Sequence, residues 1–335
     1  MSRLRNEVFT VISTMKNEGP FVLEWIAHHK ALGFDHIVVC TNDCEDTTTD
    51  LLQALARRGL AAQRNTRVWP SAGIHRSALK QARRNPKVRE ADWVFICDAD
   101  EFLNVKVGDG TVRCLVEASG AGADVISVPW RVFGHGGVRD FIDQPVTRQF
   151  TLAEHPRPKN PDAGKFGKSL FTGQERFKRF GLHQPIAHQQ HDNVILTVKP
   201  GGEPLVRQGR RTGAEPSFEV AQVNHYALRS VDAFLIKRAR GRANHMSHVL
   251  GLDYWNRFDL NHVEETSIRR YETAVADWLA ELHADSELHD LHMQAVEWYW
   301  RKVAELRSDP ALQPLIAAIE KTLSEVAKPL RKASA

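Results

Sequence analysis

Short apolar runs alternate with stretches of helical periodicity along the first 130 residues. Runs rich in β-branched and aromatic residues predict strands at 8–13, 36–40, 61–69, 93–97 and 124–128. Apolar residues spaced three and four apart predict helices around 21–32, 51–58, 71–84 and 112–118. Because strands alternate with helices, we expect an α/β fold with a doubly wound, mostly parallel sheet that helices cover on both faces.

The regular pattern fades after Trp130. Residues 131–217 are rich in Gly, Pro, His and basic residues, and such a long irregular stretch is typical of binding loops or lids. A returning strand is predicted at 220–227, and Ser230 is placed to cap the next helix. From about Glu264 onward the chain reads as helical. We therefore predict a first domain of residues 1–245, divided into halves 1–130 and 131–245, and a helical C-terminal extension of residues 246–335.

Composition sets limits on the class of protein. The chain has 335 residues, of which 42% are hydrophobic, as is ordinary for a soluble globular protein. We find no apolar run near the length that spans a bilayer, and the N-terminus lacks the apolar region of a signal peptide. None of the four cysteines forms a C-x-x-C pair, so a reduced, cytoplasmic location fits best.

The net charge of +4 is too small to indicate a nucleic-acid partner, and we expect none. The basic residues nevertheless cluster at 165–179, 207–211 and 237–242, after the acidic stretch described next. Such clusters suit a phosphate-rich substrate or an anionic membrane surface, although a solvated basic face is an equal alternative.

Three carboxylates follow the apolar run 93–97, at Asp98, Asp100 and Glu101. They repel one another unless a cation neutralises them, and the alternative is an acidic turn that faces water. Polar loops at 14–18 and 41–47 follow the first two predicted strands, so all three strand ends should share the sheet edge where nucleotides bind. Hard carboxylate oxygens hold Mg²⁺ or Mn²⁺ and bridge it to phosphates, which glycosyl transfer from a nucleotide sugar requires.

Four stretches together carry a family resemblance. They are Thr14-x-Lys16-Asn17-Glu18, Glu24-Trp25-x-x-His28-His29-x-x-Leu32-Gly33, Thr41-Asn42-x-Cys44-x-Asp46 and Phe95-Ile96-x-Asp98-x-Asp100-Glu101-Phe102. In this order and spacing they resemble the family-2-like glycosyltransferases of the GT-A fold, in the branch that also resembles the family 92 (DUF23) enzymes. The resemblance covers roughly residues 6–243 and implies a GT-A-type catalytic domain.

The resemblance also implies roles for matching residues. Asp98, Asp100 and His225 would hold a divalent cation, Mn²⁺ or Mg²⁺. We expect the donor to be contacted by nine residues: Thr14, Asn17, Glu18, Asn42, Asp46, Arg76, Asp98, Lys165 and Lys168. Many family-2 enzymes have Asp-Asp where this chain has Thr41-Asn42, so the base stays open between uridine and guanosine, with a UDP-sugar favoured.

Inversion at the anomeric carbon, which the resemblance favours, needs a carboxylate that deprotonates the acceptor hydroxyl. The candidates are Asp140, Asp143, Glu154 and Asp192, and we favour Asp140 because three nearby glycines suggest a mobile loop. A glycan, a lipid or a protein would each serve as acceptor. The basic C-terminal helix could pack on the catalytic domain or, alternatively, touch the inner face of a membrane.

Two other functions compete with this prediction. A phosphotransferase using Asp98 as nucleophile would normally carry Thr or Val two residues after the second aspartate, where this chain has Phe102. Its acidic motif would also normally follow the first strand. A non-catalytic protein that binds nucleotide sugars or glycans would need only the core pattern, not the acids, the basic loop and the late histidine together.

Overall fold

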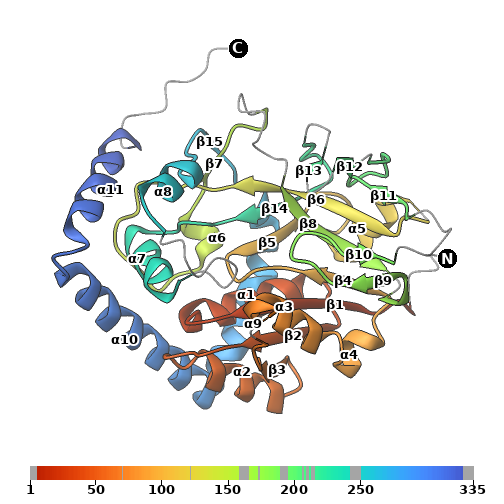
Figure 1. The fold of residues 1–335 in the computed structure, drawn as a ribbon, viewed down its shortest axis with the longest axis horizontal. Coiled ribbons are helices and arrows are strands. Elements are labelled where there is room, and N and C mark those ends of the chain that lie inside the picture. Colours follow the sequence, from red (N-terminus) through yellow and green to blue (C-terminus); the bar gives the residue numbers. More distant parts are fainter. Residues whose placement is uncertain are drawn as a thin grey trace.

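The computed structural model of the protein describes residues 6–69, 71–120, 122–157, 166–172, 174–188, 195–205, 207–208, 211–212, 216–241 and 250–326. A twisted nine-stranded sheet forms its centre, and the C-terminal helices curve around one end of the molecule (Figure 1). Within the described part of the chain, no helix is both long enough and apolar enough to cross a membrane.

The sheet combines strands from both halves of the predicted catalytic domain. Its order is β3 (Ala62–Asn65), β2 (His36–Thr41), β1 (Phe9–Met15), β4 (Trp93–Ile96), β8 (Gly167–Thr172), β6 (Val125–Val132), β14 (Ala221–His225) and β5 (Glu101–Val105), with β11 (Thr197–Val198) paired to β6. Five of the eight strand pairings described in this sheet are parallel. The predicted mostly parallel α/β sheet is therefore confirmed.

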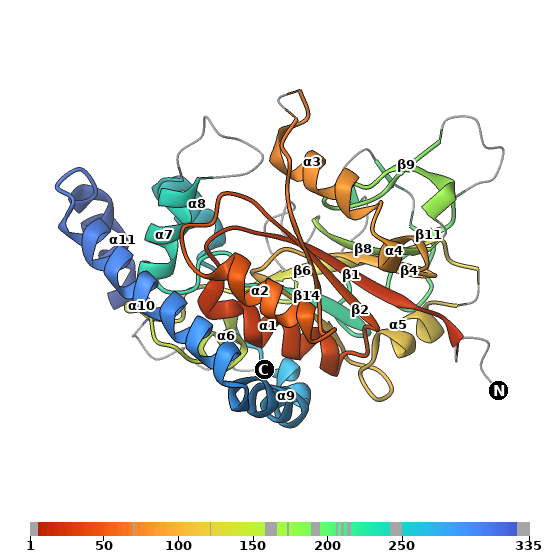
Figure 2. The same ribbon diagram turned by 90° about the horizontal axis from the view of Figure 1, so that it is seen from below.

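Helices cover both faces of the sheet (Figure 2). One face carries α1 (Gly19–Ala31), α2 (Thr48–Arg57), α5 (Val112–Ser119), α9 (Glu272–Ala284) and α10 (Ser286–Ser308). The other carries α3 (Gly73–Ala82) and α4 (Pro86–Arg89) over a smaller apolar core. Residues 19–29 of α1 are buried all round because the sheet lies on one side of this helix and α9 and α10 on the other. The C-terminal helices α9 and α10 thus share one apolar core with the sheet.

The remaining elements surround one end of the sheet or form small pairs. The helices are α6 (Val146–Gln149), η2 (Gln174–Arg176), α7 (Val231–Arg240), α8 (Leu252–Phe258), η3 (Ser267–Tyr271) and α11 (Gln313–Val326). The paired strands are β9 (Phe177–Arg179) with β10 (Ile186–Ala187), β12 (Arg207–Gln208) with β13 (Arg211–Thr212), and β7 (Leu152–Ala153) with β15 (Val263–Glu264). Ser230 caps α7 as predicted, since its hydroxyl accepts a hydrogen bond from the backbone N–H of Ala233.

Strand direction brings many chain segments to a single edge of the sheet. The strands β1, β2, β4, β6 and β14 run the same way, so their carboxyl ends meet there. Because β8 and β5 run the opposite way, their first residues reach the same edge. Lys168 near the start of β8 and Glu101 at the start of β5 therefore lie beside the end of β4. This convergence positions the candidate site.

The Tyr271 hydroxyl connects η3 to the outer strand β5 by hydrogen bonds. Its removal therefore tests how much this connection stabilises the fold. The hydroxyl accepts from the backbone N–H of Val105 at 3.0 Å and lies 2.7 Å from the carbonyl oxygen of Gly110. Tyr271→Phe leaves that buried N–H without its acceptor, so we expect the free energy of unfolding to fall by about 1–3 kcal/mol. Urea denaturation measures the loss. Tyr299→Phe is the control because the Tyr299 hydroxyl has no hydrogen-bond partner in the described structure, and equal losses in the two variants would contradict the prediction.

Candidate functional site

A cleft of about 570 Å³ opens at the edge where the strand ends meet. Its lining comes from the ends of β1, β2, β4, β6 and β14 and from α3, α7 and α8. The lining residues are Lys16, Glu18, Asn42, Asp43, Ile74, His75, Asp98, Ala99, Asp100, Trp130, Leu182, His183, His225, Lys237, Arg240, Gly241, Tyr254 and Phe258. The acidic turn after β4 lies in the wall of this cleft, as the sequence predicts.

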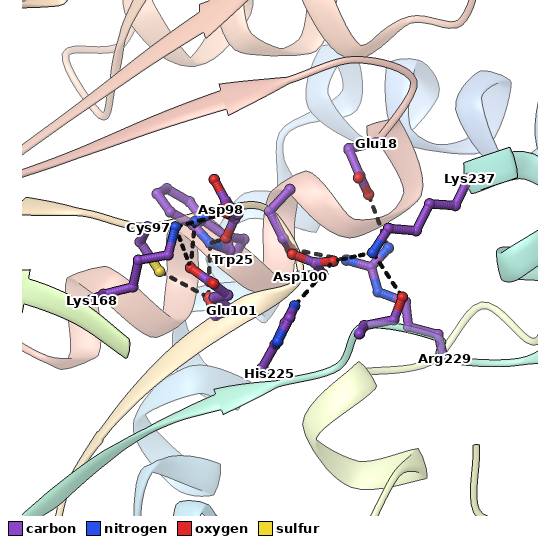
Figure 3. A network of polar contacts seen from close by, with 12 residues as sticks. Glu18, Trp25, Cys97, Asp98, Asp100, Glu101, Lys168, His225, Arg229 and Lys237 are labelled. Atoms are coloured by element: carbon purple, nitrogen blue, oxygen red, sulfur yellow. Dashed lines mark hydrogen bonds and ion pairs between the residues drawn. The ribbon is translucent and has the colours of Figure 1, made fainter. Parts of the chain in front are cut away.

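Lys168 neutralises the first aspartate of the turn (Figure 3). Its ammonium group is fully buried and lies 2.7 Å from Oδ2 of Asp98 and 3.1 Å from Oε2 of Glu101. The same Glu101 oxygen accepts a hydrogen bond from the backbone N–H of Asp98 at 2.8 Å. The indole N–H of Trp25 points at the carbonyl oxygens of Asp98 and Glu101, at 3.2 Å from each. Glu101 therefore fixes the shape of the turn instead of facing the cleft.

The two carboxyl groups that contact Lys168, those of Asp98 and Glu101, have pKa values shifted in opposite directions. Burial, reinforced by the charges of Asp98 and Asp100 and opposed by Lys168, raises the pKa of Glu101 to about 8. Burial also acts to raise the pKa of Asp98, but the charges of Lys168 and His75 outweigh it and lower that pKa. Near neutral pH, Glu101 therefore holds a proton and the Lys168 ammonium is paired mainly with Asp98.

Asp100 has its own cation, from a different element. Nζ of Lys237 on α7 lies 2.6 Å from Oδ2 of Asp100 and 2.7 Å from the carbonyl oxygen of Ala227. Nε2 of His225 lies 3.8 Å from the same carboxylate oxygen. Although burial opposes it, the charge of Lys237 and the contact with His225 hold the pKa of Asp100 well below its usual range. Burial lowers the pKa of His225, so its ring is neutral and able to act as a metal ligand.

Glu18 forms a third buried ion-pair group beside the turn. Nη1 of Arg229 lies 2.9 Å from one carboxylate oxygen, and the Arg240 guanidinium contacts the other. These charges outweigh the burial of Glu18 and lower its pKa. Arg229 also donates to the carbonyl oxygen of Ala99 at 2.9 Å, which connects Glu18 to the acidic turn. The predicted donor residue Glu18 is thus in the cleft wall but is already paired.

The residues at the ends of β1 and β2 that were predicted to contact the nucleotide sugar fall into two groups. Asn42 lines the cleft, and the Thr14 hydroxyl lies 3.1 Å from Nδ1 of the cleft residue His75. Asn17 and Asp46 instead hold backbone: the Asn17 side chain accepts from the N–H of Glu45 at 2.8 Å. Both carboxylate oxygens of Asp46 accept backbone N–H groups, from Gly19 at 2.9 Å and Thr48 at 3.0 Å. Asp46 thus joins the starts of α1 and α2.

Several other predicted residues lie elsewhere. Arg76 lies on α3 and lines a separate basic groove, and Lys165 is outside the described residues. The favoured base, Asp140, does not line the cleft. Its side chain is 63% exposed and lies 2.8 Å from Nη1 of Arg139 and 3.6 Å from Nη2 of Arg307. The structure thus places Asp140 among arginines on the outer surface, away from the acidic turn.

The structure does not place any of the other three candidates for the catalytic base in the cleft. Asp143 pairs with Nε2 of His292 at 3.1 Å, and Glu154 is buried where it accepts the backbone N–H of Val132 at 3.1 Å. Neither lines the cleft, and Asp192 is outside the described residues. Of the cations that neutralise Glu18 and Asp100, the sequence indicated Lys237 and Arg240 only as part of a basic cluster. It gave no signal for Arg229.

The predicted metal ligands are brought together only in part. In the described portion of the chain, no group of three or more His, Cys, Asp or Glu side chains is arranged to hold a metal ion. Asp98 is held by Lys168 and Asp100 by Lys237, so neither carboxylate is open on its paired side. Asp100 and His225 nevertheless face each other, and carboxylate and imidazole donors are a set that divalent ions accept. Release of Lys237 from Asp100 would open that pair.

The raised pKa of Glu101 gives a pH-dependent prediction. Between pH 4.5, its ordinary pKa, and about 8, the folded state keeps a proton that the unfolded chain releases. This carboxyl therefore makes the free energy of unfolding fall as pH rises through that window, by up to about 1.4 kcal/mol per pH unit. Glu101→Gln cannot ionise, so its stability relative to the native protein should rise over the same window. Urea denaturation across the window tests this, with the exposed Glu264→Gln as control, and parallel pH profiles for native protein and Glu101→Gln would refute it.

Comparison with known proteins adds independent information. Two plant proteins, each named a glycosyltransferase family 92 protein, are similar to this chain. The one from Ricinus communis is 25% identical over 148 residues, which are 42% of this chain and 25% of that protein. The one from Arabidopsis thaliana is 27% identical over 92 residues, 28% of this chain and 16% of that protein. The chain thus spans a quarter or less of the length of these relatives.

Solved structures give only distant matches. Residues 1–349 of S. aureus TarS match 96% of this chain and 81% of that chain, with 11% identity and a TM-score of 0.35. Glucosyl-3-phosphoglycerate synthase from Mycobacterium tuberculosis, in complex with Mg²⁺ and uridine diphosphate, matches 61% and 73%, with 16% identity and a TM-score of 0.31. Likenesses at these TM-scores carry no argument about the site.

The family model is the decisive comparison. The model described as glycosyltransferase family 92 matches residues 10–201, which is more than half of the 335 residues. The matched segment includes all of β1 except Phe9, together with β2, the acidic turn and Lys168. The chain belongs to glycosyltransferase family 92.

Proposed function

We propose that the protein is a metal-dependent glycosyltransferase that moves a sugar from a nucleotide-sugar donor to an acceptor, with inversion. Family membership supports glycosyl transfer as the class of reaction. One observation supports the rest: an acidic turn at the carboxyl edge of the sheet lines a cleft together with His225 and the cations Lys237 and Arg240. In this arrangement the carboxylates could bind a metal ion, and the basic side chains could bind phosphate groups.

The donor would lie across the ends of β1, β2 and β4. Asn42 and Asp43 at the end of β2, with His75 on α3, line the part of the cleft that suits a nucleoside. The diphosphate would then lie over Asp98 and Asp100, next to Lys237 and the guanidinium of Arg240. A uridine or a guanosine base is compatible with the proposal, and we expect a UDP-sugar.

Asp100 and His225, with Asp98 beside them, would hold Mn²⁺ or Mg²⁺. When bound, that ion supplies positive charge to the departing diphosphate. The protein's own residues do the rest: Lys237 leaves Asp100 and donates to a diphosphate oxygen, and Arg240 adds a second positive charge. Lys237 is suited to this exchange because its side chain is 18% exposed at the cleft wall, whereas the Lys168 side chain is fully buried and stays with Asp98. A charge-assisted bond to phosphate replaces the one that Lys237 gives up.

Calorimetric titration with a panel of UDP-sugars and GDP-sugars, with and without Mn²⁺, tests this function. We expect at least one donor to bind in a Mn²⁺-dependent manner and to be slowly hydrolysed. Asp100→Asn removes one ligand charge, so donor affinity and hydrolysis should fall by about 100-fold or more. Asp140→Asn is the matched control because Asp140 lies outside the cleft.

Three outcomes would count against the proposal in different ways. If no donor binds under any condition, the nucleotide-sugar assignment is wrong. If a donor binds but is neither transferred nor hydrolysed, the protein is a binding protein instead of an enzyme. If Asp100→Asn behaves like Asp140→Asn, the acidic turn is not the donor site.

A further inference from the structure

A second groove, of about 960 Å³, lies on the face of the sheet that carries α3 and α4. Its walls come from α3, from α4 and from the segment around β9. The lining residues are Ser71, Ala72, Arg76, Leu79, Lys80, Arg83, Arg84, Arg89, Glu175, Lys178, Arg179 and Phe180. Seven of these side chains are basic and one is acidic. We call this feature the basic groove.

The charge of the basic groove is largely uncompensated. In the described part of the structure, no carboxylate forms an ion pair with six of the seven basic side chains: Arg76, Lys80, Arg84, Arg89, Lys178 and Arg179. Arg76, Lys80 and Arg84 recur at intervals of four along one side of α3 and its end, and like charges at this spacing destabilise a helix. A negatively charged occupant would relieve that repulsion.

The floor of the basic groove is apolar. Leu79 and Phe180 line it and are almost completely buried, at 3% and 5% exposure. The guanidinium of Arg83 lies over the Phe180 ring, 5.3 Å from its centroid. The cationic side chains thus cover this floor, and a groove with cationic walls fits a chain that carries negative charges along its length.

The basic groove and the candidate active-site cleft use neighbouring residues of the same chain segments. On α3 and the residues before it, Ala72 and Arg76 line the groove whereas Ile74 and His75 line the cleft. On the segment after β9, Phe180 lines the groove and Leu182 and His183 line the cleft. The two depressions therefore lie on different sides of α3, and their linings are two residues apart at its start. An extended molecule in the groove would reach the cleft around that end of the helix.

We propose that the basic groove binds an acidic polysaccharide, whose chain end enters the cleft as the acceptor of the transferred sugar. This inference rests on the proposed function, since it names the acceptor class for the same reaction. The basic side chains would pair with carboxylate or phosphate groups along the chain.

The test compares two charge-reversal variants of equal charge. Arg84→Glu with Arg179→Glu changes opposite walls of the basic groove. The control is Arg269→Glu with Arg301→Glu, two exposed positions on η3 and α10, which pack with α9 on the other side of the molecule. The probes are polygalacturonate oligosaccharides, neutral dextran, an oligonucleotide of matched charge and vesicles that contain phosphatidylglycerol. Binding is measured by calorimetry without any nucleotide sugar.

We expect native protein and control to bind polygalacturonate and not dextran, and the groove variant to bind it about tenfold or more weakly. The binding should weaken as salt rises from about 0.05 M to about 0.5 M, because exposed charge pairs are screened. Equal binding by both variants would overturn the proposal. Vesicle binding without polygalacturonate binding would overturn it in favour of a membrane surface. Equal affinity for the oligonucleotide would overturn it in favour of an unselective polyanion surface.

A second readout separates this inference from the proposed function. Asp100→Asn should retain polygalacturonate binding, because the probe is tested without donor. The groove variant should retain donor binding and lose transfer to the acidic acceptor. If donor binding fails in every protein while polygalacturonate binding persists, the proposed function fails and the basic groove stands as a polysaccharide site. If donor binding persists and the groove variant still binds polygalacturonate normally, only the inference fails.

Discussion

The arrangement of this molecule depends on accommodating three carboxyl groups that fall within four residues and are partly or completely buried, two of them paired with lysines and the third protonated near neutral pH. Asp98 is the most exposed of them, at 32%, and Glu101 is completely buried. The positive charges come from elements far along the chain, with Lys168 on β8 and Lys237 on α7. Removing one partner of a buried ion pair costs about 3–5 kcal/mol, so these distant segments are held to the acidic turn by electrostatics as well as by strand pairing. The same contacts that complete the fold therefore build the site.

The two halves of the acidic turn differ in how freely they can exchange partners. Around Asp98 and Glu101, the buried Lys168, the indole of Trp25 and a backbone N–H fix every component, and Glu101 keeps a proton near neutral pH. Around Asp100, the cation is a partly exposed lysine at the cleft wall and the neighbour is a neutral histidine. In this account the first half holds the shape of the turn, and the second half changes partners when donor and metal arrive. The basic groove lies on the other side of α3 from the cleft, and in our proposal it would let one fold bind an anionic donor and an anionic acceptor.

Much of this organisation could be predicted from the sequence, because it follows from local patterns. The strands up to β6 and the helices between them alternate regularly, and the polar strand ends correctly indicated the edge where the cleft opens. The placement of His225 next to Asp100 also follows from the predicted late strand. By contrast, β8 was missed because its sequence contains only two consecutive large apolar residues, Leu170 and Phe171, and begins with Gly167 and the buried Lys168. The strand β5 was missed because Glu101 appeared to belong to the turn. Asp140 was favoured because of flexible neighbours, whereas its actual position depends on Arg139 and Arg307, whose arrangement no local pattern reveals.

The central claim is that Asp100 exchanges Lys237 for a metal ion when the donor binds. A crystal structure of the protein with a non-hydrolysable nucleotide sugar and Mn²⁺, using anomalous diffraction to locate manganese, tests it most directly. The account predicts an anomalous peak about 2.1 Å from a carboxylate oxygen of Asp100 and near Nε2 of His225, with Nζ of Lys237 moved to the diphosphate. A bound nucleotide with the Lys237–Asp100 ion pair intact, and manganese elsewhere or absent, would contradict it.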